Sequence, residues 1–291
     1  MSKKILITGA SGAFGSLAAK ALITNGHSVV GTMRSVGAKN ETIARSLQDL
    51  GVHLVEMDVT DENSVNQGTE KAIELLGGLD VVINNAGIGA MGIQEFATAD
   101  DMKTIFDVNV FGVQRLMRAV LPHLRSQGQG TIMHISSCIG RLAMPFYGTY
   151  SASKWALEAL AESYRAELSA FGIESCIVEP GGMPTSFLDA MLRPSDKSRE
   201  ASYGEMSQAP EASFAGFHQA LLANPLQRPE KVAEAISDLL DLPFGEKPFR
   251  TTVDYMGMGE PVTEYNNMLH GITRGLYGNF GMEGMLGLNK D

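Results

Sequence analysis

The chain has 291 residues, of which 44% are hydrophobic and 19% are charged, a composition typical of a globular protein rather than a disordered one. With 23 basic and 33 acidic residues the formal net charge is −10, which argues against nucleic acid as a partner. The sequence contains no uninterrupted apolar run of about eighteen residues, so it predicts no transmembrane helix.

The first part of the chain alternates short apolar runs with longer amphipathic stretches. Apolar runs bounded by glycine, asparagine or aspartate are typical of buried strands. The clearest helix is expected over Tyr150–Phe171, where apolar side chains recur near helical spacing until Gly172 ends it. Strands that alternate with helices predict an α/β fold with a doubly wound parallel sheet, the Rossmann fold. The predicted strands are Ile5–Thr8, Ser28–Thr32, His53–Met57, Val81–Asn84, Thr131–Ile135 and Ser175–Glu179.

The pattern weakens after Met183, where polar and apolar residues mix. Farther along, a helix is expected after Pro229 and a last strand over Arg250–Asp254, and the final stretch is rich in Gly, Met and Tyr without periodicity. Because no internal repeat or linker is visible, the sequence predicts a single domain. The predicted divisions are a dinucleotide-binding catalytic domain over 1–254, with a substrate lid at about 183–226, and a C-terminal extension over 255–291.

A glycine-rich turn follows the first predicted strand and opens a helix, with the sequence Thr8-Gly9-Ala10-Ser11-Gly12-Ala13-Phe14-Gly15. Glycines permit a tight turn and a close approach of the backbone to a phosphate. The helix N-terminus then favours an anion such as a pyrophosphate. The turn predicts a dinucleotide site, although a purely structural strand-to-helix turn remains an alternative.

The end of the second predicted strand indicates which dinucleotide is preferred. Sheets that bind NAD usually carry an acidic residue there for the ribose hydroxyls. This chain instead has Arg34 and Ser35, and its first acidic residue in the region is Glu41. A guanidinium and a hydroxyl suit a 2′-phosphate, which predicts NADP(H) in preference to NAD(H), unless Arg34 is an ordinary surface arginine.

Two residues at the start of the clearest helix can carry proton transfer. Tyr150 and Lys154 are four residues apart and share a helix face, so the ammonium is expected to lower the pKa of the phenol. A phenol adjusted in this way can give or take a proton at a carbonyl or alcohol oxygen. Ser137, after the fifth strand, can hydrogen-bond the same oxygen, whereas Tyr147 has no lysine four residues later.

These motifs in this order resemble the short-chain dehydrogenase/reductase family of the one-domain Rossmann type, over roughly residues 3 to 254. Around the active site, the residues Gly140–Pro145 and Trp155–Glu158 resemble its hydroxysteroid and retinol dehydrogenase branch. The matching motifs are the turn Thr8–Gly15, Asp58-Val59, Asn84-Asn85-Ala86-Gly87, the four residues Asn109, Ser137, Tyr150 and Lys154, and Pro180-Gly181-Gly182 with Thr185.

The resemblance implies an oxidoreductase that moves a hydride between a nicotinamide and a carbonyl or secondary alcohol. It implies that Tyr150 is the general acid and base, that Lys154 lowers its pKa and holds the ribose, that Ser137 orients the carbonyl, and that Asn109 extends a proton relay through a water. It also implies a homodimer or homotetramer. The residues expected to bind the cofactor are Gly9, Ser11, Gly12, Ala13, Phe14, Gly15, Arg34, Ser35, Asp58, Val59, Asn85, Ala86, Gly87, Tyr150, Lys154, Pro180, Gly181 and Thr185.

Two features depart from the family's pattern. Gly12 stands where NADP-preferring relatives often carry a basic residue, which leaves Arg34 as the main argument for NADP(H). Ala13 stands where the family has its middle glycine, and Gly12 lies one place early. A methyl group therefore faces the pyrophosphate turn and is expected to shift or weaken the cofactor. The four predicted catalytic residues are unaffected.

The lid residues Met183, Phe187 and Met191 suggest an apolar carbonyl compound as substrate, although they could equally pack the lid onto the sheet. Neither the two cysteines nor the six histidines show metal-ligand spacing, so no metal is predicted. The sequence predicts a soluble cytoplasmic protein, because the apolar run after Lys3-Lys4 is too short for a secretory signal. Two alternatives remain, a sugar-nucleotide epimerase or dehydratase and a non-catalytic dinucleotide sensor.

Overall fold

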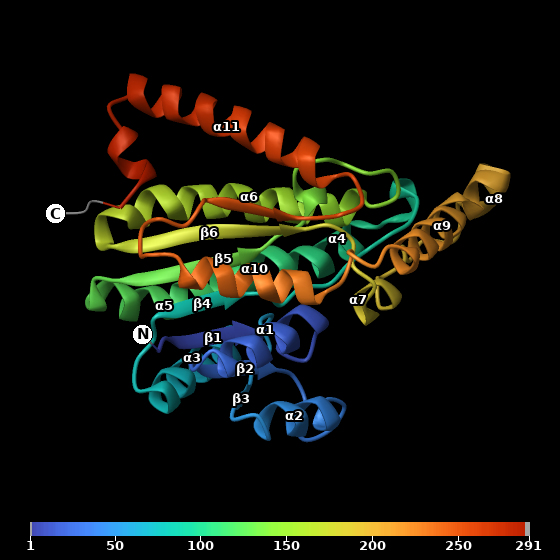
Figure 1. Ribbon diagram of the computed structural model, residues 1–291. Helices are drawn as coiled ribbons and strands as arrows, with labels where there is room; N and C mark the ends of the chain where they lie inside the picture. The colour runs from blue at the N-terminus through green and yellow to red at the C-terminus, as the bar shows by residue number, and fades with distance from the viewer. Residues whose placement is uncertain (1, 289–291) are drawn as a thin grey trace.

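The computed structural model describes residues 2–288, which form one seven-stranded parallel sheet with helices on both faces (Figure 1). The strand order is β3-β2-β1-β4-β5-β6-β7. This topology confirms the predicted Rossmann fold, and the first and last residues of the predicted divisions, 1 and 289–291, lie outside the described residues. The strands are β1 (Lys4–Thr8), β2 (Ser28–Met33), β3 (His53–Glu56), β4 (Val81–Asn84), β5 (Gly130–Ile135), β6 (Ile173–Pro180) and β7 (Arg250–Val253).

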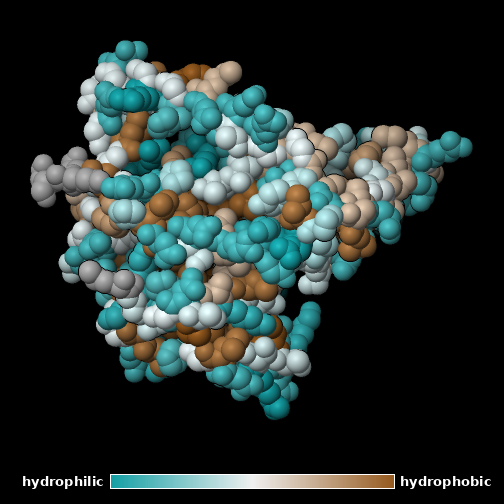
Figure 2. Space-filling view, in the orientation of Figure 1, coloured by the Kyte–Doolittle hydropathy of each residue, from teal (hydrophilic) through white to brown (hydrophobic). Residues whose placement is uncertain are grey.

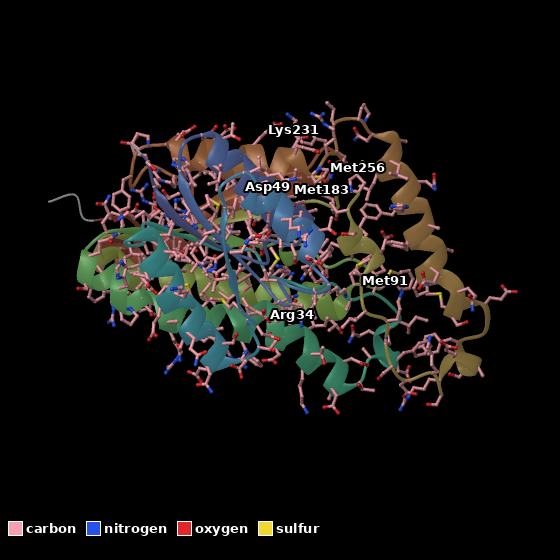
Figure 3. The ribbon with its side chains drawn as sticks, turned by 90° about the horizontal axis from the view of Figure 1, so that it is seen from below. Arg34, Asp49, Met91, Met183, Lys231 and Met256 are labelled. Atoms are coloured by element: carbon pink, nitrogen blue, oxygen red, sulfur yellow. The ribbon has the colours of Figure 1, made fainter. Side chains whose placement is uncertain are left out.

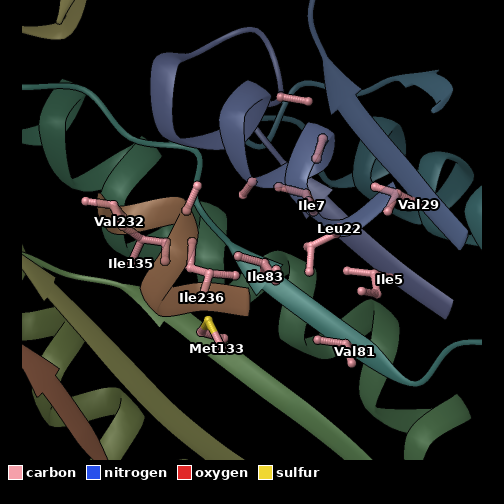
Figure 4. Close-up of a cluster of buried hydrophobic side chains, with 14 of the residues drawn as sticks. Ile5, Ile7, Leu22, Val29, Val81, Ile83, Met133, Ile135, Val232 and Ile236 are labelled. Atoms are coloured by element: carbon pink, nitrogen blue, oxygen red, sulfur yellow. The ribbon is translucent and has the colours of Figure 1, made fainter. Parts of the chain in front are cut away.

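One face of the sheet is covered by α1 (Ala13–Thr24), α2 (Glu41–Gln48) and α10 (Glu230–Asp241). Figure 4 shows Leu22 and Ile236 from the helices packed against Ile7 and Ile83 from the central strands. All four side chains are buried, and each burial contributes on the order of 1.5–3 kcal/mol. This packing holds the ends of β1 and β4 beside each other.

The opposite face is covered by α3 (Glu62–Leu76), α5 (Gly112–Gln127) and α6 (Gly148–Leu168). The predicted helix at Tyr150–Phe171 is confirmed as α6, which begins two residues earlier and continues as a 3-10 turn over Ser169–Phe171. Gly172 ends it in the left-handed conformation with φ of +65°, as its position predicts. The short helix α4 (Ala99–Phe106) passes into α5 through a π-helical turn, Asp107–Phe111.

The lid region, residues 183–226, contains three helices that project from the sheet as an arm, at the right of Figure 1. Figure 2 shows apolar side chains on this arm and a hollow between it and the part of the chain that carries α2. The weak sequence pattern reflects the mixed environment, since these helices bury only part of their surface. They are α7 (Ser186–Asp189), α8 (Glu200–Tyr203) and α9 (Ala209–Ala223).

The C-terminal extension contains a helix that the sequence pattern does not predict. α11 (Gly259–Asn279) runs beside β7, and the 3-10 turn that follows it, Glu283–Leu286, contacts α6 (Figure 1). The helix could not be predicted, because its sequence lacks a helical hydrophobic period. Its apolar residues do not form a single buried stripe: Val262 is buried, whereas Met268 and Ile272 are more than 60% exposed.

No helix within residues 2–288 is long and apolar enough to cross a membrane. In the same part of the chain, no cluster of three or more His, Cys, Asp or Glu side chains is arranged to hold a metal ion.

Candidate active site

A cavity of about 1050 Å³ lies at the carboxyl edge of the sheet, between the strand ends and the lid. Ligands of doubly wound sheets bind at this edge, because the loops that leave parallel strands meet there. The cavity extends from Arg34 after β2 to Phe187 in α7. It is therefore long enough to bring both predicted halves of a site, for cofactor and for substrate, into one space.

The glycine-rich turn lines the middle of the cavity and opens α1. Gly9 adopts a φ of +68°, and a Cβ there would lie 2.8 Å from Ala86 Cα, so only glycine allows the two loops to approach. Gly12 caps α1 without a side-chain hydrogen bond, which leaves the first turn's N–H groups for an anion. The cradle suits a pyrophosphate, and Ala13 lines it as the departure from the family pattern implies.

Gly15 does not line the cavity, unlike the other cofactor residues predicted from the turn. A Cβ at Gly15 would lie 2.5 Å from Gly9 O and 2.7 Å from Asn85 Nδ2. Its role in the structure is therefore to let α1 pack against the turn. Asn85 fixes the other side of this contact, because its Nδ2 donates to Thr8 O at 2.8 Å.

The far end of the cavity is basic. The Arg34 side chain is 67% exposed, and its Nη1 lies 3.8 Å from Asp58 Oδ2. Ser35 has a φ of +53°, which turns the chain so that Lys39 also lines the cavity. Sequence reasoning missed Lys39, because the turn that returns it to the site is not visible as a motif. Arg34, Ser35 and Lys39 together provide donors suited to a phosphate.

Ser137 and Tyr150 line the opposite half of the cavity. Ser137 follows β5, and its Oγ donates to Pro180 O at 3.3 Å. Burial raises the pKa of Tyr150 above its ordinary value, and a hydrogen bond with Ser137 works in the opposite direction. The expected lowering of the pKa of Tyr150 is therefore absent from the structure, because desolvation outweighs the interactions that favour the phenolate.

Lys154 lies one turn after Tyr150, with its Nζ 5.8 Å from the centre of the Tyr150 ring. The ammonium donates to Ile135 O at 2.8 Å. Burial lowers the pKa of Lys154 to about 8, while Glu158, one turn farther along α6, acts against the shift. The side chain is thus still largely protonated at neutral pH and can donate to a ligand in the cavity.

Asn109 lies in the π-helical turn between α4 and α5, and it does not line the cavity. Its Oδ1 accepts from Ile88 N at 2.9 Å, and its Nδ2 donates to Ile88 O and to Ser153 Oγ. The extra residue of a π turn often marks a functional site, because it redirects a side chain. Here it directs Asn109 toward the loop after β4, next to Gly87.

The substrate half of the cavity is apolar. Met183, Phe187 and Met191 all line it, and the ring of Phe187 lies 5.9 Å from the ring of Tyr150. Met256, which belongs to the extension after β7, lines the cavity as well, and Figure 3 labels it together with Met183 and Arg34. The start of the C-terminal extension therefore contributes to the same chamber as the lid.

All the predicted cofactor and catalytic residues except Gly15 and Asn109 line the cavity. Sequence reasoning missed the lining side chains of the loop before α6 and of the extension, whose only signal was their density of methionine and aromatic residues. Tyr147 was set aside for lack of a lysine, yet it lines the chamber as well. The missed residues include Ile88, Ile139, Met144, Phe146, Tyr147, Met256 and Met258.

Both cysteines are free and buried. Burial raises the pKa of the Cys138 thiol, and it raises that of Cys176 to about 12. Neither thiol is therefore activated as a nucleophile.

Residues 3–195 match the short chain dehydrogenase family, so the chain belongs to this family of oxidoreductases acting on CH–OH groups. A curated 3-ketodihydrosphingosine reductase of Bacteroides thetaiotaomicron is 41% identical over 185 residues, which span 64% of this chain and 65% of that protein. Human retinol dehydrogenase 8 is 37% identical over 195 residues, or 65% of this chain and 62% of that protein. The matched part thus spans about two thirds of these relatives.

Solved structures agree with this assignment. A short-chain dehydrogenase from Streptomyces avermitilis superposes with a TM-score of 0.75 at 29% identity, covering 97% of this chain and 98% of that one. A short-chain dehydrogenase/reductase from Burkholderia phymatum in complex with NAD gives a TM-score of 0.72 at 26% identity, over 86% and 89% of the two chains.

Proposed function

We propose that the chain is an NADP(H)-dependent carbonyl reductase, reversible as an alcohol dehydrogenase, that acts on an apolar ketone or secondary alcohol. The observation that carries the proposal is that the cavity at the carboxyl edge of the sheet is basic at one end and apolar at the other. Arg34 and Lys39 line one end, Tyr150 and Ser137 lie toward the other, and the chamber beyond them is formed by methionine and aromatic side chains.

In this proposal the chain's residues position the reacting carbonyl and move one proton. Ser137 Oγ and the Tyr150 hydroxyl donate to the carbonyl oxygen, and Tyr150 transfers its proton to that oxygen as the alcohol forms. A raised pKa suits this step, because the phenol stays protonated at neutral pH. Lys154 holds the nicotinamide ribose, and Asn109 fixes the loop around Ile88. The bound dinucleotide supplies or accepts the hydride.

The apolar substrate class is supported by the chamber and by the relatives. The names of the two relatives described above refer to long apolar compounds, a ketosphingoid and a retinol. In this chain Phe187, Met183 and Met191 provide matching apolar walls beside Tyr150. Thioethers adapt to irregular shapes, so the methionines favour flexible or bulky aliphatic substrates.

The epimerase or dehydratase alternative has less support, because residues 3–195 match the short chain dehydrogenase family. The sensor alternative also has less support, since such proteins tend to lack the tyrosine or the lysine, and here Tyr150 and Lys154 both line the cavity.

The proposal is tested by following absorbance at the nicotinamide band with NADPH and NADH and a panel of ketones, aldehydes and alcohols. We expect NADPH oxidation with medium- and long-chain aliphatic ketones, and weaker turnover with small or charged carbonyl compounds. Equal or better use of NADH, or turnover confined to charged substrates, would contradict the proposal.

We expect Phe187→Ala to lower kcat/KM for an aliphatic ketone by about 10- to 100-fold, because the lost ring removes on the order of 1.5–3 kcal/mol of apolar contact. The Kd for NADPH, measured by fluorescence titration, should change little. Phe214→Ala is the matched control: Phe214 belongs to the same lid but stacks on His218 and lies outside the cavity. Equal losses in the two variants would show that the lid's packing, rather than contact with substrate, is responsible.

A further inference from the structure

A network of buried charged groups lies behind the active site, between α6, β6, β7 and α11. It comprises Arg141, Glu158, Glu179 and Arg250, none of which is more than 7% exposed. Arg250 Nε donates to Glu158 Oε2 at 2.9 Å, and Arg141 Nη1 lies 3.6 Å from the same oxygen. Buried charges are costly unless paired and hydrogen-bonded, so the position of each member depends on the others.

Asn266 of α11 completes this network from the C-terminal extension. Its Nδ2 donates to Glu179 Oε2 at 2.6 Å, and its Oδ1 accepts from Arg141 Nε at 3.1 Å. The neighbouring Tyr265 places its ring 5.1 Å from the Arg141 guanidinium carbon. One buried amide thus bridges a cation and an anion that lie 4.0 Å apart, Arg141 Nε and Glu179 Oε1.

Both side chains that Asn266 holds belong to segments that carry the proposed active site. Glu179 directly precedes Pro180, whose carbonyl accepts from Ser137 Oγ. Arg141 ends the turn that begins at Ser137, with its N–H donating to Cys138 O at 3.0 Å. Cys138 Sγ in turn lies 3.4 Å from Glu179 O, which joins the two segments directly. A shift of Asn266 is therefore transmitted to Ser137 and to the Pro180 carbonyl within a few bonds.

The carboxylate of Glu179 needs this support. Burial, together with the nearby Glu158, raises the pKa of Glu179 to about 7, while Thr252, Arg250 and Asn266 act against the shift. Removing a donor from such a group leaves a buried charge short of hydrogen bonds, and the segment then relaxes.

We propose that Asn266 is a positioning residue: by bridging Arg141 and Glu179 it lets the C-terminal helix fix the segments that carry Ser137 and Pro180. The inference rests on the proposed function for its kinetic consequence, but its structural part can be tested without a substrate. The C-terminal extension is then a working part of the active site.

Hydrogen exchange of the full-length protein tests the structural part directly. We expect Asn266→Ala to accelerate amide exchange in the segments 136–145 and 180–186, with no change in β1 or α1. Asn267→Ala is the matched control, because Asn267 is an exposed neighbour on the same helix. Unchanged exchange in both segments overturns the proposal, whether or not the proposed activity is found.

Steady-state kinetics with NADPH and the aliphatic ketone turned over fastest test the consequence. We expect Asn266→Ala to lower kcat by about tenfold with little change in KM or in the Kd for NADPH, because small misplacements of reacting groups are costly. The kcat of Asn266→Ser, whose hydroxyl can still donate and accept at shorter reach, should lie between those of the wild-type protein and Asn266→Ala. This variant also tests the proposal if Asn266→Ala does not fold. A normal kcat in variants with accelerated exchange also overturns the proposal.

Discussion

Tyr150→Phe is expected to lower kcat by about a thousandfold, since general acid catalysis by a positioned side chain typically contributes 10²–10⁴-fold. The variant loses only the hydroxyl that the proposal uses as proton donor, so the ring still packs against Phe187. Ketone reduction is measured by NADPH absorbance, and cofactor binding by fluorescence titration. The Kd of the variant for NADPH should equal that of the wild-type protein, although turnover is lost.

Tyr147→Phe is the control for this experiment. Tyr147 also lines the cavity, three residues earlier, but it lies before α6 and its hydroxyl has no proposed role in proton transfer. This variant should retain most of the activity. Equal activities of Tyr150→Phe and the wild-type protein would remove Tyr150 from the mechanism, and a comparable loss in both variants would assign the effect to the chamber as a whole.

Arg34→Asp is expected to change the ratio of kcat/KM for NADPH to that for NADH by about a hundredfold in favour of NADH. A charged hydrogen bond contributes about 1.5–3 kcal/mol, and the new carboxylate can also accept from the ribose hydroxyls. The existing contact with Asp58, at 3.8 Å, would become a repulsion at the same end of the cavity. The ratio is measured with one ketone at fixed concentration.

Arg45→Asp provides the matched control for charge. Arg45 is exposed on α2, pairs with Glu41 and lies outside the cavity. Replacing it with Asp changes the net charge of the protein as much as Arg34→Asp does. Its coenzyme ratio should remain that of the wild-type protein. An unchanged ratio in Arg34→Asp would contradict the assigned role of Arg34, and a comparable shift in both variants would indicate a long-range field rather than a contact.

The sheet and the cofactor half of the cavity could be predicted from the sequence because their signals are local. In β4, for example, Val81, Val82 and Ile83 are buried within the sheet and are all apolar, and the polar Asn84 ends the run. The glycine-rich turn has a conformation, at Gly9, that only glycine adopts easily, so its spacing is informative. Strand limits differ by one or two residues, as at β6, which begins at Ile173 rather than at Ser175.

Part of the lining near the lid and the pKa of Tyr150 could not be predicted, because they depend on contacts between distant segments. Met256 and Lys39 reach the cavity through turns that carry no motif, and α11 is helical although its apolar side chains point in several directions. Whether Lys154 lowers the pKa of Tyr150 depends on how far burial opposes it, and spacing in a sequence contains no information on desolvation.

The two halves of the cavity come from largely separate stretches of chain. In the proposed function, nearly all the residues that hold the dinucleotide precede the lid, whereas the lid and the segment at Met256 and Met258 supply many of the apolar lining residues. Substrate range can therefore diverge while the coenzyme chemistry stays intact. A chimera that carries both the lid and the C-terminal extension of a relative would acquire that relative's substrate selectivity. Exchanging the lid alone would leave a cavity whose apolar lining comes from two proteins and does not fit together.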